Sequence, residues 1–279
     1  MARYERQLLL GGRWLPVTQY VAFFRADPQR CVEVMTEHWA PMYRRRFGAL
    51  PRHRVVRGAG LEGLLEHLLP LRSIEEDKHL FLPTRHPEWT ALFTDRRQSA
   101  GGSIGGGLQE RGVETVVIAD SPNADRRPRG WRAPVGYRYF SWGVPCEPWT
   151  ASNGVSWSSV TSSVRVAVDD NGRWEFLLMS SRGGGAAIAE GMPAPVGVVW
   201  DESARLTPNR FTHEHLRLAC ERLGLFPFDA DFYAPEGWGL VLERADPAAA
   251  EQVGFTLAQA RGEEPDPPSD RPVVTAPVG

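Results

Sequence analysis

The chain has 279 residues, 42% of them hydrophobic, and a formal net charge of −2. A chain of this size buries about 70–75% of the surface that its unfolded form exposes, so it needs neither disulfides nor a metal to fold. The near-neutral charge provides no overall field for nucleic acid or an anionic membrane, which argues against both as partners. Lys78 is the single Lys beside 31 Arg. GC-rich codon usage explains this bias, and a preference for the planar guanidinium at anion or aromatic contacts is the alternative.

The cysteines indicate no disulfide framework, because Cys31, Cys146 and Cys220 are an odd and widely spaced set. Cys31 and Cys220 fall on the apolar faces of predicted helices and are expected in the core. The N-terminal apolar run is too short for a signal peptide, and no run of 18 apolar residues occurs. We expect a cytoplasmic protein without a membrane partner.

The first half of the chain predicts two helices among several strands. A strand at Val21–Arg25 precedes Asp27 and Pro28, which suit the N-cap and the first position of a helix. An apolar stripe at helical spacing then leads to Arg44–Arg46. Their positive charges interact favourably with the negative, C-terminal end of the helix dipole, and an anion-binding site is the alternative interpretation. Further along we expect a strand at 54–57, a Leu-rich helix at 58–69, and strands at 80–82, 89–94 and 113–119.

The second half contains the clearest local signal, a hairpin. Asn171-Gly172 separates two strand-like runs at 164–168 and 173–179, and both turn residues readily adopt positive φ. A strand at 137–142 precedes this hairpin. Thr212 is expected to cap a helix that ends at Gly224, and a strand at 238–242 follows.

Strands and helices mix without regular alternation, which predicts a single α+β domain over residues 1–245. We expect a curved mixed or antiparallel sheet with three or four helices packed mainly on one face. A short C-terminal helix at 246–261 and a disordered Pro-rich tail at 262–279 complete the chain. A boundary near 120–135 is possible, although this stretch is more typical of a long loop.

A glycine-rich stretch at 101–107 lies between two predicted strands, where α/β nucleotide-binding proteins hold phosphate. The candidate phosphate-binding residues are Gly102, Ser103, Gly105 and Gly106. The spacing matches neither the dinucleotide fingerprint nor the P-loop, so a flexible connection is the alternative interpretation.

The histidines do not form a recognisable metal site. His213 and His215 would point about 200° apart on a helix and could share an ion only on a strand. His79 and His86 could serve in acid–base chemistry with nearby carboxylates, but the sequence marks no nucleophile. Those carboxylates are Asp77, Glu88 and Asp95. We expect neither a metal nor a cofactor.

The segment 126–157 interleaves arginines with aromatic residues, a composition typical of protein interfaces and of surfaces that stack single-stranded nucleic acid or sugars. Strand alternation puts Tyr137 and Tyr139 on one face and Arg138, Phe140 and Trp142 on the other. One aromatic set therefore stays outside, or both fill a core. The candidate binding residues are Trp131, Arg132, Arg138, Phe140 and Trp142.

Two stretches resemble an uncharacterised family of stand-alone cytoplasmic bacterial proteins from GC-rich genomes. One runs from Arg210-Phe-Thr-His-Glu-His-Leu to Leu223-Gly-Leu-Phe-Pro-Phe-Asp-Ala-Asp-Phe-Tyr233. The other runs from Glu88-Trp-Thr-Ala-Leu-Phe to the strand at 113–119, and the Arg46-Phe-Gly48 region adds to it. The resemblance implies a fold and a bacterial origin. It implies no activity and no catalytic residue, and the glycines at 101–107 depart from it.

These observations lead to three hypotheses about function. The first is a non-catalytic protein that binds another protein, such as an immunity factor that neutralises a bacterial toxin. The second is a nucleotide- or phosphate-using enzyme with the 101–107 loop in its site. The third is single-stranded nucleic-acid binding by the 126–157 segment, against which the near-neutral charge argues. The sequence leaves the oligomeric state and the strand order open.

Overall fold

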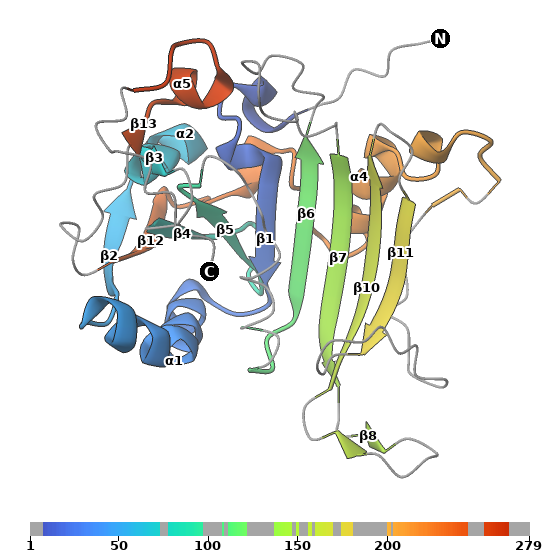
Figure 1. Cartoon of the computed structure of the whole chain (residues 1–279), viewed down its shortest axis with the longest axis horizontal. Coiled ribbons are helices and arrows are strands. Elements are labelled where there is room, and N and C mark those ends of the chain that lie inside the picture. The colour runs from blue at the N-terminus through green and yellow to red at the C-terminus, as the bar shows by residue number, and fades with distance from the viewer. Residues whose placement is uncertain are drawn as a thin grey trace, which may run out of the picture.

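The computed structural model is built around a nine-stranded sheet in which every paired strand is antiparallel to its neighbour (Figure 1). It describes residues 8–72, 78–96, 108, 111–121, 137–146, 149–150, 156–157, 160–169, 174–180, 200–201, 203–244 and 254–267. In spatial order the strands are β11 (Trp174–Ser180), β10 (Val160–Asp169), β7 (Tyr137–Cys146), β6 (Thr115–Ser121), β1 (Tyr20–Phe24), β5 (Thr90–Thr94), β4 (Lys78–Pro83), β12 (Trp238–Glu243) and β2 (Arg52–Arg57). Two small sheets pair β3 (Leu71–Arg72) with β13 (Gly254–Phe255) and β8 (Trp149–Thr150) with β9 (Ser156–Trp157).

Two of the helices begin at the capping residues that the sequence predicts. The α-helices are α1 (Pro28–Phe47), α2 (Gly60–Leu65), α4 (His213–Glu221) and α5 (Leu257–Arg261), and 3-10 turns occur at η1 (Leu9–Gly12), η2 (Val17–Gln19), η3 (Glu66–Leu68), η4 (Thr207–Asn209) and η5 (Ala230–Phe232). The Asp27 side chain accepts from the Arg30 backbone N–H at 2.9 Å, and Thr212 accepts from that of His215 at 3.3 Å. Each cap satisfies a donor that the first helical turn leaves unpaired.

The sheet has a core on each face. Helices α2, α4 and α5 contribute apolar side chains to the core that contains Phe23, Phe93 and Phe140. Helix α1 packs on the opposite face, where Cys31 and Met35 meet Phe81. This arrangement confirms an α+β fold in which most of the described helices lie on one face. Within the described ranges, no helix is both long and apolar enough to cross a bilayer.

The hairpin prediction agrees with the pairing of β10 and β11, in which Val168 lies opposite Trp174. The Asn171-Gly172 turn itself lies outside the described residues. Other neighbours in the sheet are far apart in the chain. Strand β1 lies between β6 and β5, and β12 lies between β4 and the edge strand β2.

The expected C-terminal helix at 246–261 is present only in its last residues, and it is wrong at Gly254–Phe255. Gly254–Phe255 forms β13, because Phe255 is buried and pairs with Leu71 of β3. The helix occupies only Leu257–Arg261 and starts at Thr256, whose side chain accepts from the Gln259 backbone at 3.1 Å. Residues 246–253 lie outside the described residues, and so do residues 268–279 of the tail expected at 262–279. The tail begins in an ordered turn, in which Glu263 donates its backbone N–H to the Ala258 carbonyl at 2.9 Å.

Candidate recognition pocket

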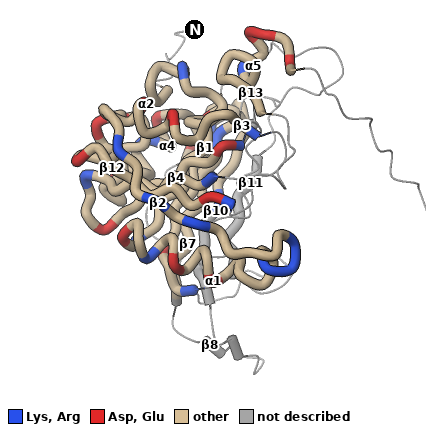
Figure 2. The backbone as a smooth tube through the Cα atoms, turned by 90° about the vertical axis from the view of Figure 1, so that its left-hand side faces the viewer, with Lys and Arg blue, Asp and Glu red and all other residues tan. Residues whose placement is uncertain are grey.

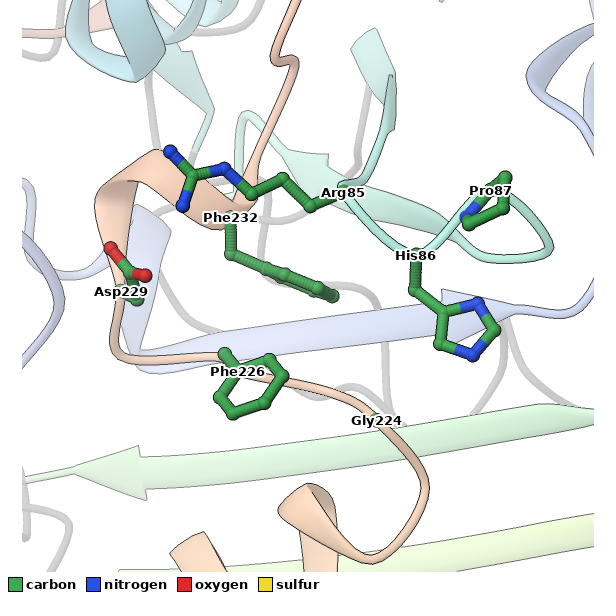
Figure 3. A pocket seen from close by; sticks show the side chains of 7 residues that line it. All are labelled: Arg85, His86, Pro87, Gly224, Phe226, Asp229 and Phe232. Atoms are coloured by element: carbon green, nitrogen blue, oxygen red, sulfur yellow. The ribbon is translucent and has the colours of Figure 1, made fainter.

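A pocket of about 430 Å³ lies where the turn between β4 and β5 meets the segment that follows α4 (Figure 3). Two short backbone segments, distant in sequence, form it. Its lining residues are Arg85, His86, Pro87, Gly224, Phe226, Asp229 and Phe232.

The β4–β5 turn is held by hydrogen bonds on its inner side. Buried Thr84 donates its backbone N–H to the Trp89 carbonyl at 3.2 Å, and Trp89 donates back to the His86 carbonyl at 2.9 Å. The Thr84 hydroxyl lies 2.8 Å from the His86 carbonyl oxygen and 2.9 Å from that of Trp89. Because these bonds fix the turn from below, Arg85 and His86 are presented toward the pocket on a defined backbone.

The opposite wall begins at the end of α4. Leu225 donates its backbone N–H to the Cys220 carbonyl at 3.0 Å, and Gly224 donates to that of Glu221 at 2.9 Å. This pair of bonds is a Schellman motif, which requires the left-handed conformation that Gly224 adopts with φ of 71°. A Cβ atom on Gly224 would lie 2.6 Å from Cδ2 of His86. Glycine is therefore required here both for the turn and for the approach of the His86 ring.

Aromatic rings form the floor of the pocket. Phe232 is buried and meets Phe226 edge to face, with ring centroids 5.7 Å apart. Phe226 itself is 47% exposed, which is unusual for a large apolar side chain. Beneath them, the Tyr233 hydroxyl donates to the Pro227 carbonyl at 2.7 Å, and burial raises the pKa of this phenol well above its usual value of 10.0. The centroid of the Tyr233 ring lies 6.2 Å from that of Phe23 on β1, which connects the floor to the sheet.

Charged and polar groups stand at the two ends of this floor. Figure 3 shows the Arg85 guanidinium and the Asp229 carboxylate at one end, with the His86 ring at the other. Arg85 lies 3.8 Å from the carboxylate of Asp231, and both side chains are well exposed. The Nδ1 atom of His86 is buried and has no hydrogen-bond partner among the described residues. An apolar group with a polar rim is the chemistry that such a pocket suits.

A carboxylate–imidazole pair joins β6 to the first turn of α4. The Asp120 carboxylate is 2.6 Å from Nδ1 of His213, whose ring centroid is 4.4 Å from that of Phe228. Such a pair fixes the orientation of an imidazole and can support proton transfer. Among the described residues, no hydroxyl or thiol is hydrogen-bonded to His213, and no three potential ligands converge as a metal site. The second oxygen of Asp120 has no partner within the same set.

The Arg/aromatic residues of β7 contribute to the core more than to a surface. Arg138 and Phe140 are buried, and the Arg138 guanidinium donates to the carbonyls of Phe211 at 2.7 Å and Pro208 at 3.2 Å. Trp142 is half-buried and donates to Glu114 at 2.8 Å. The expectation that these residues face a partner is therefore wrong for Arg138 and Phe140, because helix α4 and its preceding segment cover that face of β7. Trp131 and Arg132 lie outside the described residues.

The tyrosines of the same strand pack on the other face of the sheet. Tyr139 stacks on Tyr137 with centroids 5.9 Å apart and on Tyr20 at 6.4 Å, and the Arg165 guanidinium lies 5.6 Å from its ring. Both aromatic sets therefore contact a core, which is the second of the two alternatives that alternation allows. The phosphate-loop candidates Gly102, Ser103, Gly105 and Gly106 lie outside the described residues.

His79 and His86, which the sequence grouped as a candidate acid–base pair, lie in different parts of the structure. His79 is buried under α1, with its ring centroid 5.3 Å from that of Trp39, whereas His86 lies in the pocket. His213 and His215 occupy the first turn of α4, as the Thr212 cap predicts, and His215 accepts from the Thr212 backbone at 3.2 Å.

The described carboxylates and thiols that the sequence singled out are buried or ion-paired. Asp95 is buried at the end of β5, Glu88 pairs with Arg25 at 2.7 Å, and Asp77 lies outside the described residues. Cys31 and Cys220 are buried in the core as predicted, and burial raises the pKa of the Cys31 thiol to about 12.

Sequence reasoning missed the pocket. Phe226 and Phe232 lie in a stretch without helical or strand periodicity, which marks them neither as core nor as surface. The available signal was Gly224 followed closely by aromatic and acidic residues, a turn that brings exposed side chains together. Nothing local indicates that this turn meets His86.

Comparison of the chain with protein-family models, with curated proteins and with solved structures gave no match. The assignment of a function therefore depends on the geometry of the chain itself.

Proposed function

We propose that this protein is a recognition protein that binds another polypeptide, with the pocket at Phe226 as the anchor point. One observation carries the proposal: a half-exposed phenylalanine rests on a buried aromatic floor beside an arginine. Aromatic residues and arginine dominate the energetics of protein interfaces, especially where the surrounding backbone is already fixed. The hydrogen-bonded turn and the Schellman motif supply that fixed backbone.

The openness of the pocket favours a side chain carried by a partner over a free small molecule. The Arg85 side chain is 57% exposed and Phe226 is 47% exposed, so a bound group would be covered from one side only. Small-molecule sites usually cover about 70–90% of the ligand surface. A partner protein would complete the enclosure, placing an aromatic or branched side chain on Phe226.

Binding alone is sufficient for one biological role, that of an immunity factor neutralising a bacterial toxin. Such a factor acts by covering its target and needs no chemistry of its own. The proposal predicts that a toxin encoded beside this gene is neutralised in cells by the wild-type protein and not by Phe226→Ser. If Phe226→Ser still neutralises the toxin, the pocket is not the surface that binds it.

A random-peptide phage library tests the binding function without knowledge of the partner. Peptides selected on the wild-type protein should bind Phe226→Ser about 30-fold more weakly in fluorescence anisotropy, the loss typical of an interface anchor. Leu206→Ser is the matched control, because Leu206 is also a large exposed apolar residue, at 59%, and lies outside the pocket. Peptides that bind both variants as tightly as the wild type would overturn the proposal, as would failure to select any peptide.

A further inference from the structure

The sheet ends at a strongly basic edge. Residues 41–61 contain six arginines and one histidine but no aspartate or glutamate. The arginines are Arg44, Arg45 and Arg46 in the last turn of α1 and Arg52, Arg54 and Arg57 on strand β2. Figure 2, which looks onto the β2 side of the molecule, shows basic residues along β2 and at the end of α1. We call these six residues the arginine edge.

The side chains of the arginine edge are exposed. All six arginines are exposed, and Val55 between them is 62% exposed. The facing acidic residue on β12 is Glu243, which pairs with Arg54 at 3.3 Å. The segment 41–61 therefore carries an excess of positive charge, which favours an acidic partner.

The ladder between β2 and β12 identifies which backbone groups of β2 point away from the sheet. Gly58 donates to the Gly237 carbonyl at 3.1 Å, one residue beyond the pair of Arg57 with Trp238. Hydrogen-bonded pairs alternate along an antiparallel ladder, so Val56 bonds to β12 whereas Val55 and Arg57 point their N–H groups away from it. Because β2 is the last strand of the sheet, these groups face the edge.

The outward backbone groups and the exposed arginines lie on the same edge strand. An edge strand offers a template for one more strand, and alternate pockets or charges along it select the side chains of the added segment. We propose that the arginine edge binds an acidic, extended polypeptide segment, which adds as a strand beside β2. The segment would pair with the outward groups of His53 and Val55 and place its carboxylates among the arginines. It would stop before Arg57, because the Arg57 carbonyl oxygen already lies 3.3 Å from Nε2 of His67. This surface is separate from the pocket at Phe226, so either proposal can fail without the other.

Arginines on an edge strand can also serve only to prevent pairing between molecules, and they can bind any polyanion. A blocked, fluorescently labelled peptide of alternating Glu and Val distinguishes these possibilities. We expect it to bind the full-length protein, and we expect the corresponding Lys–Val peptide not to bind. A Glu–Val peptide N-methylated at alternate residues lacks the backbone donors and should bind at least tenfold more weakly.

Two variants of the protein complete the test. Val55→Pro removes one outward N–H and should weaken binding of the Glu–Val peptide at least tenfold. The triple variant Arg44→Gln, Arg45→Gln, Arg57→Gln leaves the Arg54–Glu243 pair intact and should lower both the affinity and its dependence on salt. Equal binding of the normal and N-methylated peptides would overturn strand addition, and so would tighter binding of an oligothymidylate than of the Glu–Val peptide. No binding of either acidic peptide would show that the arginines only protect the edge.

Discussion

The pocket at Phe226 and the arginine edge are both exposed, yet they are built in opposite ways. The pocket walls are fixed by backbone hydrogen bonds and by an aromatic floor tied to the core. The arginine edge has long, solvated side chains on a strand whose outer hydrogen-bonding groups point to the edge. The pocket therefore provides a rigid apolar anchor, whereas the edge provides charge and a backbone template. Substitutions in the pocket walls should therefore lower stability more than matched substitutions at the edge.

The largest difference should come from two glycines that share one conformation. Gly224 and Gly48 end helices of the two regions and both have φ of 71°. A Cβ on Gly224 would lie 2.6 Å from His86, whereas a Cβ on Gly48 would meet nothing within 4 Å. Gly48→Ala should cost about 1 kcal/mol for the left-handed conformation alone. Gly224→Ala should cost about 2–3 kcal/mol, because the His86 ring must also move.

Urea denaturation of the two variants measures this difference directly. If both variants lose the same unfolding free energy, the His86 ring can move away from the new Cβ without an energetic penalty. The pocket wall would then be less rigid than its hydrogen bonds indicate.

An intermediate effect is expected at Tyr233, below the pocket floor. Tyr233→Phe removes the hydrogen bond to the Pro227 carbonyl and should lower stability by about 1 kcal/mol at neutral pH. Burial raises the pKa of this phenol above 10.0, so the folded state holds the proton more tightly than the unfolded state does. The contribution of Tyr233 to stability is then complete below pH 10.0 and decreases as the pH rises above that value.

Denaturation curves recorded from neutral pH to above pH 10 test the sign. The wild-type protein should lose more stability over this range than Tyr233→Phe. A parallel decline of the two proteins would show that Tyr233 does not titrate differently on folding.

The smallest effect is predicted at the edge. Val55→Pro should change the unfolding free energy by no more than about 0.5 kcal/mol, because proline is tolerated on an edge strand where the N–H faces solvent. Val56→Pro is the control, since its N–H bonds to β12 and its side chain is buried. Similar destabilisation of both would contradict the assignment of outward and inward groups on β2.

Local chemistry made much of the fold predictable. The Asp27-Pro28 start of α1, the Thr212 cap and the turn at Gly224 are each set by a few neighbouring residues, and the structure reproduces them. The periodicity of β7 also separated its two faces correctly. The sequence did not reveal that both of those faces would be covered, because coverage depends on elements distant in the chain.

The same limit explains why the candidate site was missed. The pocket exists because Gly224 meets His86 and Phe226 meets Phe232, and these contacts require the order of strands around β4. Strand order is a nonlocal property that neither alternation nor capping encodes. The arginine edge shows the converse: its charges are visible in the sequence, but only the position of β2 at the end of the sheet gives them an open backbone.

The central claim, that a polypeptide partner anchors on the pocket, is tested most directly by isothermal titration of a phage-selected peptide against the wild-type protein, Phe226→Ser and Leu206→Ser. The account predicts an affinity about 30-fold lower for Phe226→Ser and unchanged for Leu206→Ser. Equal affinity of the peptide for all three proteins would contradict it.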